Sequence, residues 1–381
     1  MSSVSATGEL PIVPQYGRQT LSDLLPSIAY QFGVGDTDRL GLGAGEQWVV
    51  VLVDGLGTEQ LEQVASRAPF LSGELRRAQV ITAGVPSTTV TSLTSLGTGL
   101  PPGGHGVAGF TCRLPETDEI VAPLFWSSAM TAREFQPEPT VFEQLAGQGV
   151  AVSSVMPSRF EGSFLTVAGL RGGEVVGIDD EADQLLRITR TVEAAERSER
   201  SLVYCYEREL DHCGHAYGWR SQEWLDCLIR IDRWCSWLRA ELPEEVRLII
   251  TADHGMVDVP DDRRLVVEAE PDLLAGVRQL AGEARFRQLY LEPAETPRAV
   301  ARRWADRLGD AAWVRTRDEA VAEGWFGPLS DRVAGRFGDV VVAMAEPAAV
   351  LTEQMPGEFD LVGMHGSLSS AEMLVPLLQP E

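Results

Sequence analysis

Along residues 48–251, short continuous apolar runs alternate with longer segments whose apolar positions recur every three or four residues. The continuous runs predict buried strands, and the periodic segments predict amphipathic helices. We therefore expect strands at 48–53, 79–82, 150–155, 201–206 and 246–251, and helices at 58–65, from 89 onward, and at 140–147, 181–196 and 221–241. Strands that alternate with helices in this way are typical of an α/β fold with a mostly parallel, doubly wound sheet covered on both faces.

The segment after Pro260 is built from shorter and more charged pieces. Candidate strands at 264–268, 286–291 and 313–316 and a candidate helix at 297–308 predict a small inserted α+β cap. The apolar stretches 338–345 and 373–378 are expected to return to the main sheet. The predicted domains are an N-terminal leader at 1–34 that packs on the core, a core at 35–260 and 338–381, and the cap at 261–337.

No apolar run approaches the roughly 20 residues that a membrane-spanning helix requires. Residues 1–15 lack the basic start, apolar middle and cleavage site of a secretory signal. The five cysteines form no CxxC pair. These features predict a protein that crosses no membrane, resides in the cytoplasm and keeps its thiols reduced.

Charge narrows the choice of partners. The 32 basic and 56 acidic side chains give a net charge of −24, which repels polyanions and argues against a nucleic-acid polymer as a partner. A small anionic substrate would need local positive charge, and bound divalent cations can supply it.

Two of the expected strands carry acidic side chains to their carboxyl ends. Asp54 follows the strand at 48–53, and Asp253 and His254 follow the strand at 246–251. Ligand sites of open α/β sheets are built at that edge. Taken alone, an aspartate at a strand end such as Asp54 is more often the N-cap of the next helix, and the single position leaves a metal-binding role open.

Histidines add to these carboxylates. Asp211 and His215 form a D-x-x-G-H pattern after the strand at 201–206, and His365 lies between glycines near the C-terminus. A carboxylate and an imidazole four residues apart can converge on one cation, and such ligands suit zinc or manganese. Three of the five histidines fall in these glycine-flanked fragments.

Residues 86–99 are rich in hydroxyl groups, and Val90, Leu93 and Leu96 lie three apart, so one face can pack as a helix. A Thr89 hydroxyl in the first turn would lie in the field of the helix N-terminus, which favours a developing alkoxide and an incoming phosphate oxygen. From this segment alone, capping by serine and threonine without any chemistry is the favoured interpretation.

The ordered set of Asp54, Thr89, D-x-x-G-H at 211–215, Asp-His-Gly at 253–255 and His-Gly at 365–366 resembles the nucleotide pyrophosphatase/phosphodiesterase branch of the alkaline phosphatase superfamily. The resemblance implies an alkaline phosphatase-like fold and a two-metal phosphoric ester hydrolase that acts on a small phosphoester or nucleotide. It implies two divalent ions, zinc by preference and otherwise manganese. One would be held by Asp211, His215 and His365, and the other by Asp54, Asp253 and His254, with Thr89 beside the second.

The same resemblance implies a reaction in which Thr89 attacks phosphorus in line and water then hydrolyses the phosphothreonine. Paired cations about 3.5 to 4 Å apart would stabilise the entering and leaving oxygens. Ser92 stands where relatives usually carry asparagine, and its hydroxyl can donate one hydrogen bond to a phosphate oxygen. Arg159 is the expected cationic contact to substrate, and His105 is expected to orient other groups.

Several other functions stay open or are disfavoured. A phosphonate hydrolase similar to phosphonoacetate hydrolase would use a comparable threonine and metal set, and a phosphomonoesterase is a further alternative. A sulfatase would need a C-x-P-x-R site, which the chain lacks. A metal-stabilised binding protein that has lost catalysis is the alternative from another class, and the retained Thr89 argues against it.

Overall fold

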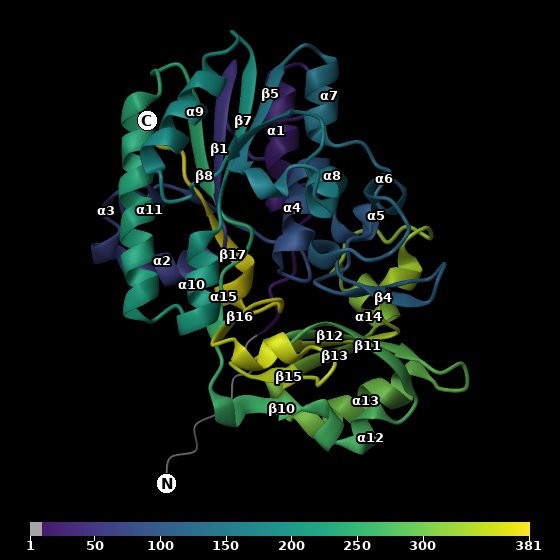
Figure 1. Ribbon diagram of the computed structural model, residues 1–381. Coiled ribbons are helices and arrows are strands. Elements are labelled where there is room, and N and C mark those ends of the chain that lie inside the picture. Colours follow the sequence, from purple (N-terminus) through teal and green to yellow (C-terminus); the bar gives the residue numbers. More distant parts are fainter. Residues whose placement is uncertain (1–9) are drawn as a thin grey trace.

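The main sheet has five parallel strands in the order β6-β5-β7-β1-β8 (Figure 1). The structure is a computed structural model that describes residues 10–381. The strands are β1 (Gln47–Val53), β5 (Ala151–Pro157), β6 (Glu174–Ile178), β7 (Ser201–Glu207) and β8 (Arg247–Thr251). The apolar run of β1 is buried from Trp48 to Val53, as expected for a central parallel strand covered on both faces. The predicted doubly wound α/β fold is confirmed.

Helices cover both faces of this sheet (Figure 1). One side carries α9 (Gln184–Ala195) and α11 (Gln222–Glu241), and the other carries α1 (Leu24–Gln31), α4 (Thr89–Thr98) and α7 (Val141–Gly147). Trp224 and Trp234 of α11 are fully buried, which agrees with their helical spacing. No helix within residues 10–381 is long and apolar enough to cross a membrane.

Shorter elements connect these layers. They are α2 (Thr58–Gln63), α3 (Pro69–Leu75), β2 (Gln79–Thr82), α5 (Pro102–His105), β3 (Cys112–Leu114), β4 (Glu119–Val121), α6 (Ala132–Phe135), α8 (Phe164–Gly169) and α10 (Glu209–Tyr217). Of the expected leader, residues 1–9 lie outside the described part of the chain. Within the rest of it, Leu21, Leu24, Leu25 and Ile28 are fully buried in the main core.

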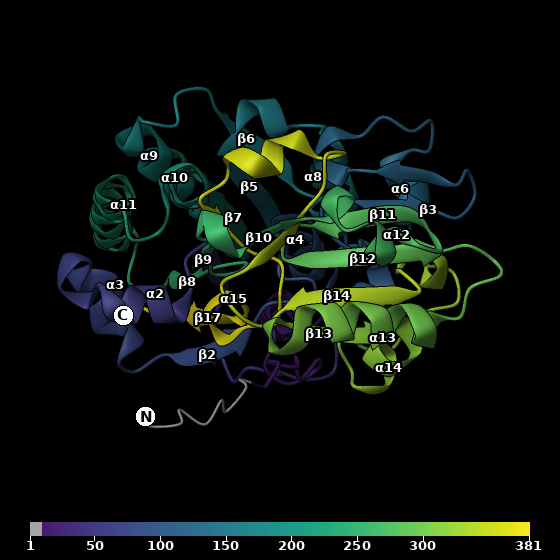
Figure 2. The same cartoon turned by 90° about the horizontal axis from the view of Figure 1, so that it is seen from below.

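A second sheet lies below the first in Figure 1 and faces the viewer in Figure 2. Its antiparallel strands are β11 (Val277–Glu283), β12 (Phe286–Leu291), β14 (Val340–Met344) and β13 (Ala312–Thr316), in that order. Helix α13 (Pro297–Leu308) packs on β13 and β14 and buries Trp304 in a separate apolar core. Helices α12 (Pro271–Leu274) and α14 (Arg317–Ala322) complete this part.

The expectation that residues 338–345 return to the main sheet was wrong. Strand β14 lies between β12 and β13 in the second sheet. All five of its side chains are buried. The apolar run therefore indicates a central strand but does not indicate which sheet contains it. The division into domains at 35–260, 338–381 and 261–337 stays a prediction.

The C-terminal residues reach the main sheet by a different route. Strand β17 (Leu374–Leu377) pairs antiparallel with β2, and the next residue, Leu378, exchanges two backbone hydrogen bonds with Ile250 of β8. The other pairs are β10 (Arg264–Val266) with β15 (Ala349–Leu351) and β9 (Val257–Asp258) with β16 (Gly363–Met364). Helix α15 (Ser370–Met373) precedes β17.

Candidate active site

The carboxyl ends of β1, β7 and β8 lie side by side because the three strands are parallel neighbours. Asp54 follows β1 directly, and its amide donates to the carbonyl oxygen of Glu207, the last residue of β7 (2.8 Å). The amide of Gly55 donates to Oδ1 of Asp253, which follows β8 (3.1 Å). Backbone contacts at the sheet edge therefore fix the two carboxylates next to each other.

The D-x-x-G-H pattern lies on α10 and not in a loop. Asp211 and His215 occupy successive turns, and His215 Nε2 is 3.3 Å from Asp211 Oδ2. A side chain at Gly214 would come within 2.3 Å of the Met256 sulfur, so glycine lets the helix approach the loop after β8. His215 Nδ1 donates to the carbonyl oxygen of Gly363 (2.8 Å), which leaves Nε2 free to bind a cation.

His365 completes the first cluster from the far end of the chain. Its Nδ1 donates to the carbonyl oxygen of Ser87 (2.9 Å). Its Nε2 lies 3.3 Å from His215 Nε2 and 3.8 Å from Asp211 Oδ1. Ligand atoms of Asp211, His215 and His365 all lie within 4.8 Å of one another, so these three side chains could hold one cation.

A second cluster adjoins the first. Its ligand atoms, from Asp54, Asp211 and His254, also lie within 4.8 Å of one another. Asp253 is close to it, with Oδ2 3.4 Å from His254 Nε2, and Asp54 Oδ1 is 3.5 Å from the same nitrogen. The structure thus places the expected set of Asp54, Asp253 and His254 together, and it also brings Asp211 between the two clusters.

Thr89 is the first residue of α4, and Thr88 is its N-cap. The Thr89 Oγ1 lies 3.2 Å from His254 Nε2 and 3.5 Å from Asp54 Oδ1. Neighbouring hydroxyls are engaged elsewhere, since Ser87 donates to the carbonyl oxygen of Ser367 (2.6 Å) and Thr91 to that of Val107 (3.3 Å). Thr89 is therefore the hydroxyl of this run that meets the acidic cluster.

The electrostatics of the clusters fit bound cations. Burial, followed by the nearby carboxylates of Asp253 and Asp211, raises the pKa of Asp54 well above its ordinary value. Burial also raises the pKa of Asp253, and burial next to His254 lowers the pKa of His365 well below its ordinary value. Asp211 Oδ1 and Asp253 Oδ2 are buried without a hydrogen-bond partner among residues 10–381. Cations would satisfy these oxygens and offset the crowded negative charge.

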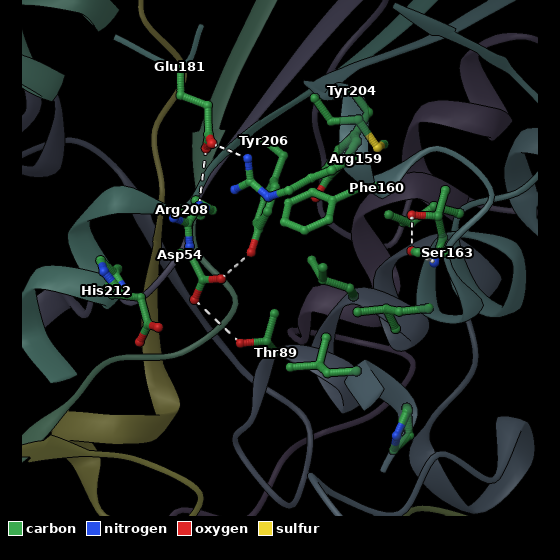
Figure 3. Close-up of a pocket in the computed structure, with 18 of the residues that line it drawn as sticks. Asp54, Thr89, Arg159, Phe160, Ser163, Glu181, Tyr204, Tyr206, Arg208 and His212 are labelled. Carbon is green, nitrogen blue, oxygen red and sulfur yellow. Dashed lines mark hydrogen bonds and ion pairs between the residues drawn. The ribbon is translucent and has the colours of Figure 1, made fainter. Parts of the chain in front are cut away.

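A pocket of about 490 Å³ opens beside Thr89 and Asp54 (Figure 3). Arg159 lines it, as does Arg208, and both guanidinium groups contact Glu181. The Ser92 side chain is fully buried one turn after Thr89, and its Oγ has no hydrogen-bond partner within the described chain. Arg159 thus lines the same pocket as Thr89, whereas Ser92 does not line it, and the roles of both residues stay predictions.

The two remaining histidines, His105 and His212, are not part of either cluster. His105 is fully buried; its Nδ1 accepts from the amide of Val107 (3.0 Å), so Nε2 carries the proton and donates to the hydroxyl of Ser95 on α4 (2.9 Å). This contact is consistent with the expected orienting role. His212 of α10 is exposed and lines the Thr89 pocket (Figure 3).

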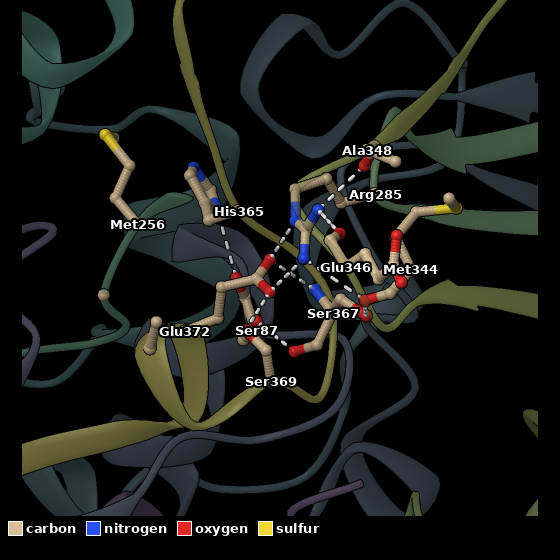
Figure 4. A network of polar contacts seen from close by, with 12 residues as sticks. Ser87, Met256, Arg285, Met344, Glu346, Ala348, His365, Ser367, Ser369 and Glu372 are labelled. Carbon is tan, nitrogen blue, oxygen red and sulfur yellow. Dashed lines mark hydrogen bonds and ion pairs between the residues drawn. The ribbon is translucent and has the colours of Figure 1, made fainter. Parts of the chain in front are cut away.

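A buried ion pair supports the loop that carries His365 (Figure 4). Arg285 and Glu372 are both fully buried and meet through two hydrogen bonds of 2.7 and 2.6 Å. Glu372 also accepts from the amide of Ser367 (3.0 Å) and the hydroxyl of Ser369 (2.5 Å). Arg285 precedes β12, so the pair ties the second sheet to the segment just after His365.

The sequence had not singled out Tyr206, Arg208, Glu181, Arg285 or Glu372. Tyr206 lies near the end of β7 and donates to Asp54 Oδ2. Its spacing of two residues from Tyr204, which places both side chains on one face of the strand, was the signal in the sequence that could have found it. The arginine and glutamate contacts join segments that are distant in the chain, so spacing gave no signal for them.

The fold and this constellation define a member of the alkaline phosphatase superfamily. A profile of the family "Type I phosphodiesterase / nucleotide pyrophosphatase" matches residues 48–368. The chain belongs to this family.

Individual proteins resemble this chain over a short stretch of sequence or in overall fold. Ectonucleotide pyrophosphatase/phosphodiesterase family member 7 of Mus musculus, like that of Rattus norvegicus, is 44% identical over 64 residues, a stretch that spans 16% of this chain and 15% of the relative. An inactive murine ectonucleotide pyrophosphatase/phosphodiesterase 5 in complex with AMP superposes with a TM-score of 0.69 at 18% identity over 87% of each chain. Phosphonoacetate hydrolase from Sinorhizobium meliloti in complex with phosphonoformate gives 0.65 at 22% identity, over 87% of this chain and 89% of the other.

Proposed function

We propose that this protein is a two-metal phosphodiesterase or nucleotide pyrophosphatase that acts through Thr89. The observation that carries the proposal is the position of the Thr89 hydroxyl at the first turn of α4, 3.2 Å from His254 Nε2 and 3.5 Å from Asp54 Oδ1 of the second cluster. Family membership supports phosphoester hydrolysis as the class of reaction. A small phosphoester or nucleotide substrate, zinc as the metal and a cytoplasmic location stay predictions.

In the proposed reaction, Thr89 Oγ1 forms a bond to phosphorus as its proton passes to solvent, and the bond from phosphorus to the leaving oxygen breaks, so that an alcohol protonated from solvent or a phosphate departs. Water then attacks phosphorus, the bond from phosphorus to Oγ1 breaks, and the phosphate product is released as Oγ1 regains a proton. Asp211, His215 and His365 would hold one divalent ion, and Asp54, Asp253 and His254 the other. Two such ions supply positive charge that stabilises the entering and leaving oxygens. The first-turn amides of α4 would face a phosphate oxygen.

A phosphonate hydrolase remains the second candidate. The observation that favours it is the pair of arginines at the rim of the Thr89 pocket, because a phosphonate substrate with a carboxylate needs a second cationic contact.

The test is a hydrolysis screen of the zinc-reconstituted protein against bis-p-nitrophenyl phosphate, p-nitrophenyl phosphate, nucleoside triphosphates and phosphonoacetate. We expect turnover of the diester or the nucleotides, with Thr89→Ala as the inactive control. Turnover of the monoester or the phosphonate alone would reject the diesterase proposal. The absence of all turnover would favour the binding-protein alternative.

A further inference from the structure

The rim of the Thr89 pocket carries two arginines that converge on one carboxylate (Figure 3). Arg159 lies in the 3-10 turn Ser158–Phe160 after β5, Glu181 precedes α9, and Arg208 is the residue before α10. Oε1 of Glu181 accepts from Arg159 Nη1, and its Oε2 accepts from Arg208 Nε (3.1 Å). Each oxygen of the Glu181 carboxylate therefore accepts a hydrogen bond from a different guanidinium group.

The guanidinium groups are held in place but are not enclosed. Arg159 lies over the ring of Phe160, 4.7 Å from its centroid, and its side chain is 50% exposed. The Arg208 side chain is 30% exposed, and its second contact is Glu209 Oε1 (3.1 Å). An arginine has five N–H donors, so both groups keep donors beyond these contacts.

The Glu181 carboxylate shows where an anion of the same shape can bind. Two guanidinium groups that converge on one carboxylate can accept the carboxylate or phosphate of a ligand in that place, through hydrogen bonds between charged groups. Asp118 and Glu143 are likewise each contacted by two arginines, so its place beside Thr89 is what sets this pair apart. The pair lines the same pocket as Asp54 and Thr89.

We propose that Arg159 and Arg208 form an anion subsite that selects substrates with a second negatively charged group beyond the reacting phosphorus, and that Glu181 competes for this subsite. The inference rests on the proposed function, because it takes the Thr89 pocket as the place where phosphorus binds. The substrate class is thereby a phosphoester or phosphonate that carries a further carboxylate or phosphate.

The competition predicts that two substitutions change the selection of anionic substrates in opposite directions. Arg159→Met removes a donor from the subsite, so selection of the anionic substituent should fall about tenfold, a change that one charge-assisted hydrogen bond supports. Glu181→Gln removes the competing charge, so selection should rise. Arg197→Met is the matched control, because Arg197 is 43% exposed and paired with Glu174 but does not line the pocket.

The experiment measures two ratios on the zinc-reconstituted full chain. One is the ratio of the association constant of 2-carboxyethylphosphonate to that of propylphosphonate, measured by calorimetry. The other is the ratio of kcat/KM for the 2-carboxyethyl and propyl diesters of p-nitrophenyl phosphate. We expect both ratios to change as described for Arg159 and Glu181, and to stay at the wild-type value in Arg197→Met.

The outcomes separate the two proposals. Equal ratios in the wild type and Arg159→Met would overturn the anion subsite, even if diesters are hydrolysed. A lower ratio in Glu181→Gln would overturn the competition by Glu181. If no diester is hydrolysed but the calorimetric ratio follows the expected pattern, the proposed function fails while the anion subsite stands.

Discussion

The hydroxyl of Thr89 differs from its neighbours in what surrounds it. Ser87 and Thr91 donate to carbonyl oxygens of the chain, whereas Thr89 Oγ1 faces His254 and Asp54. A hydroxyl in this place can be activated as a nucleophile. We therefore expect Thr89→Ala to lower kcat by several orders of magnitude while metal content and the thermal unfolding midpoint remain unchanged.

Thr88→Ala is the matched control for that prediction. Thr88 is the N-cap of α4, with no side-chain capping hydrogen bond, so its loss should affect kcat only mildly. Measurement of kcat for both variants with the best substrate of the screen decides whether Thr89 or Thr88 is the nucleophile. Near-normal turnover by Thr89→Ala, or an inactive Thr88→Ala, would assign the covalent step to another residue.

His105 gives a pH-dependent contribution to stability. Burial, followed by the charges of Arg336 and Arg332, lowers its pKa to about 3 from 6.5. The unfolded chain therefore binds a proton at this site between pH 6.5 and pH 3 that the folded chain does not, and stability is lost as the pH falls through that window. Between pH 7 and pH 5 the loss is about 2 kcal/mol.

Urea unfolding of the wild type and His105→Gln at the two pH values tests this expectation. The variant lacks the titrating ring, so its free energy of unfolding should fall by about 2 kcal/mol less than that of the wild type. An identical fall in both proteins would mean that His105 becomes protonated in the folded state.

Elements that combine strong periodicity with sufficient length were predictable from the sequence. Strand β12 and helix α13 have the expected bounds, and β1, β8 and α11 begin one residue from theirs. The neighbours of a strand were not predictable, because β14 has the apolar run of any central strand. At the site, Asp54, Asp253 and His254 followed from the strand ends. Arg285 and Glu372 did not, since only the fold brings them together.

The Arg285–Glu372 pair connects an element of the second sheet to the His365 loop. Glu372→Gln removes the charge that holds Arg285 and weakens the support of the Ser367 amide. We expect the affinity of the Asp211, His215 and His365 cluster for zinc to fall by about 10- to 100-fold, as is typical when a group that orients a ligand is lost. A competitive chelator titration should show one weakened site and one unchanged site.

Glu358→Gln is a suitable control, because Glu358 pairs with the buried Arg287 in the same part of the molecule. Both variants should be less stable, since each leaves a buried arginine without its charged partner. Only Glu372→Gln should change zinc affinity. Equal zinc affinities in the two variants would show that the Arg285–Glu372 pair acts on stability alone.

At the scale of the whole molecule, the clusters link metal binding to folding. Buried carboxylates gather from Asp54, Asp211 and Asp253, and two cations would relieve their repulsion. Ligands that bind only the folded state stabilise it. We expect two divalent ions per chain after reconstitution, measured by elemental analysis, and a lower thermal midpoint after chelation.

Asp54→Asn sharpens this test. The substitution removes one of the repelling charges, so the midpoint should fall less on chelation than it does in the wild type. A content of one ion or fewer, or a midpoint that chelation leaves unchanged, would contradict the two-metal site.

The backbone contact between Leu378 and Ile250 lies at the outer edge of β8, the last strand of the five-stranded sheet. An uncovered strand edge is a template on which another polypeptide can pair. We therefore expect residues 374–378 to keep this edge of β8 from pairing with a second copy of the chain. A chain shortened before Leu374 should form oligomers that light scattering detects. An incomplete chain that ends at this point during synthesis should be prone to aggregation for the same reason.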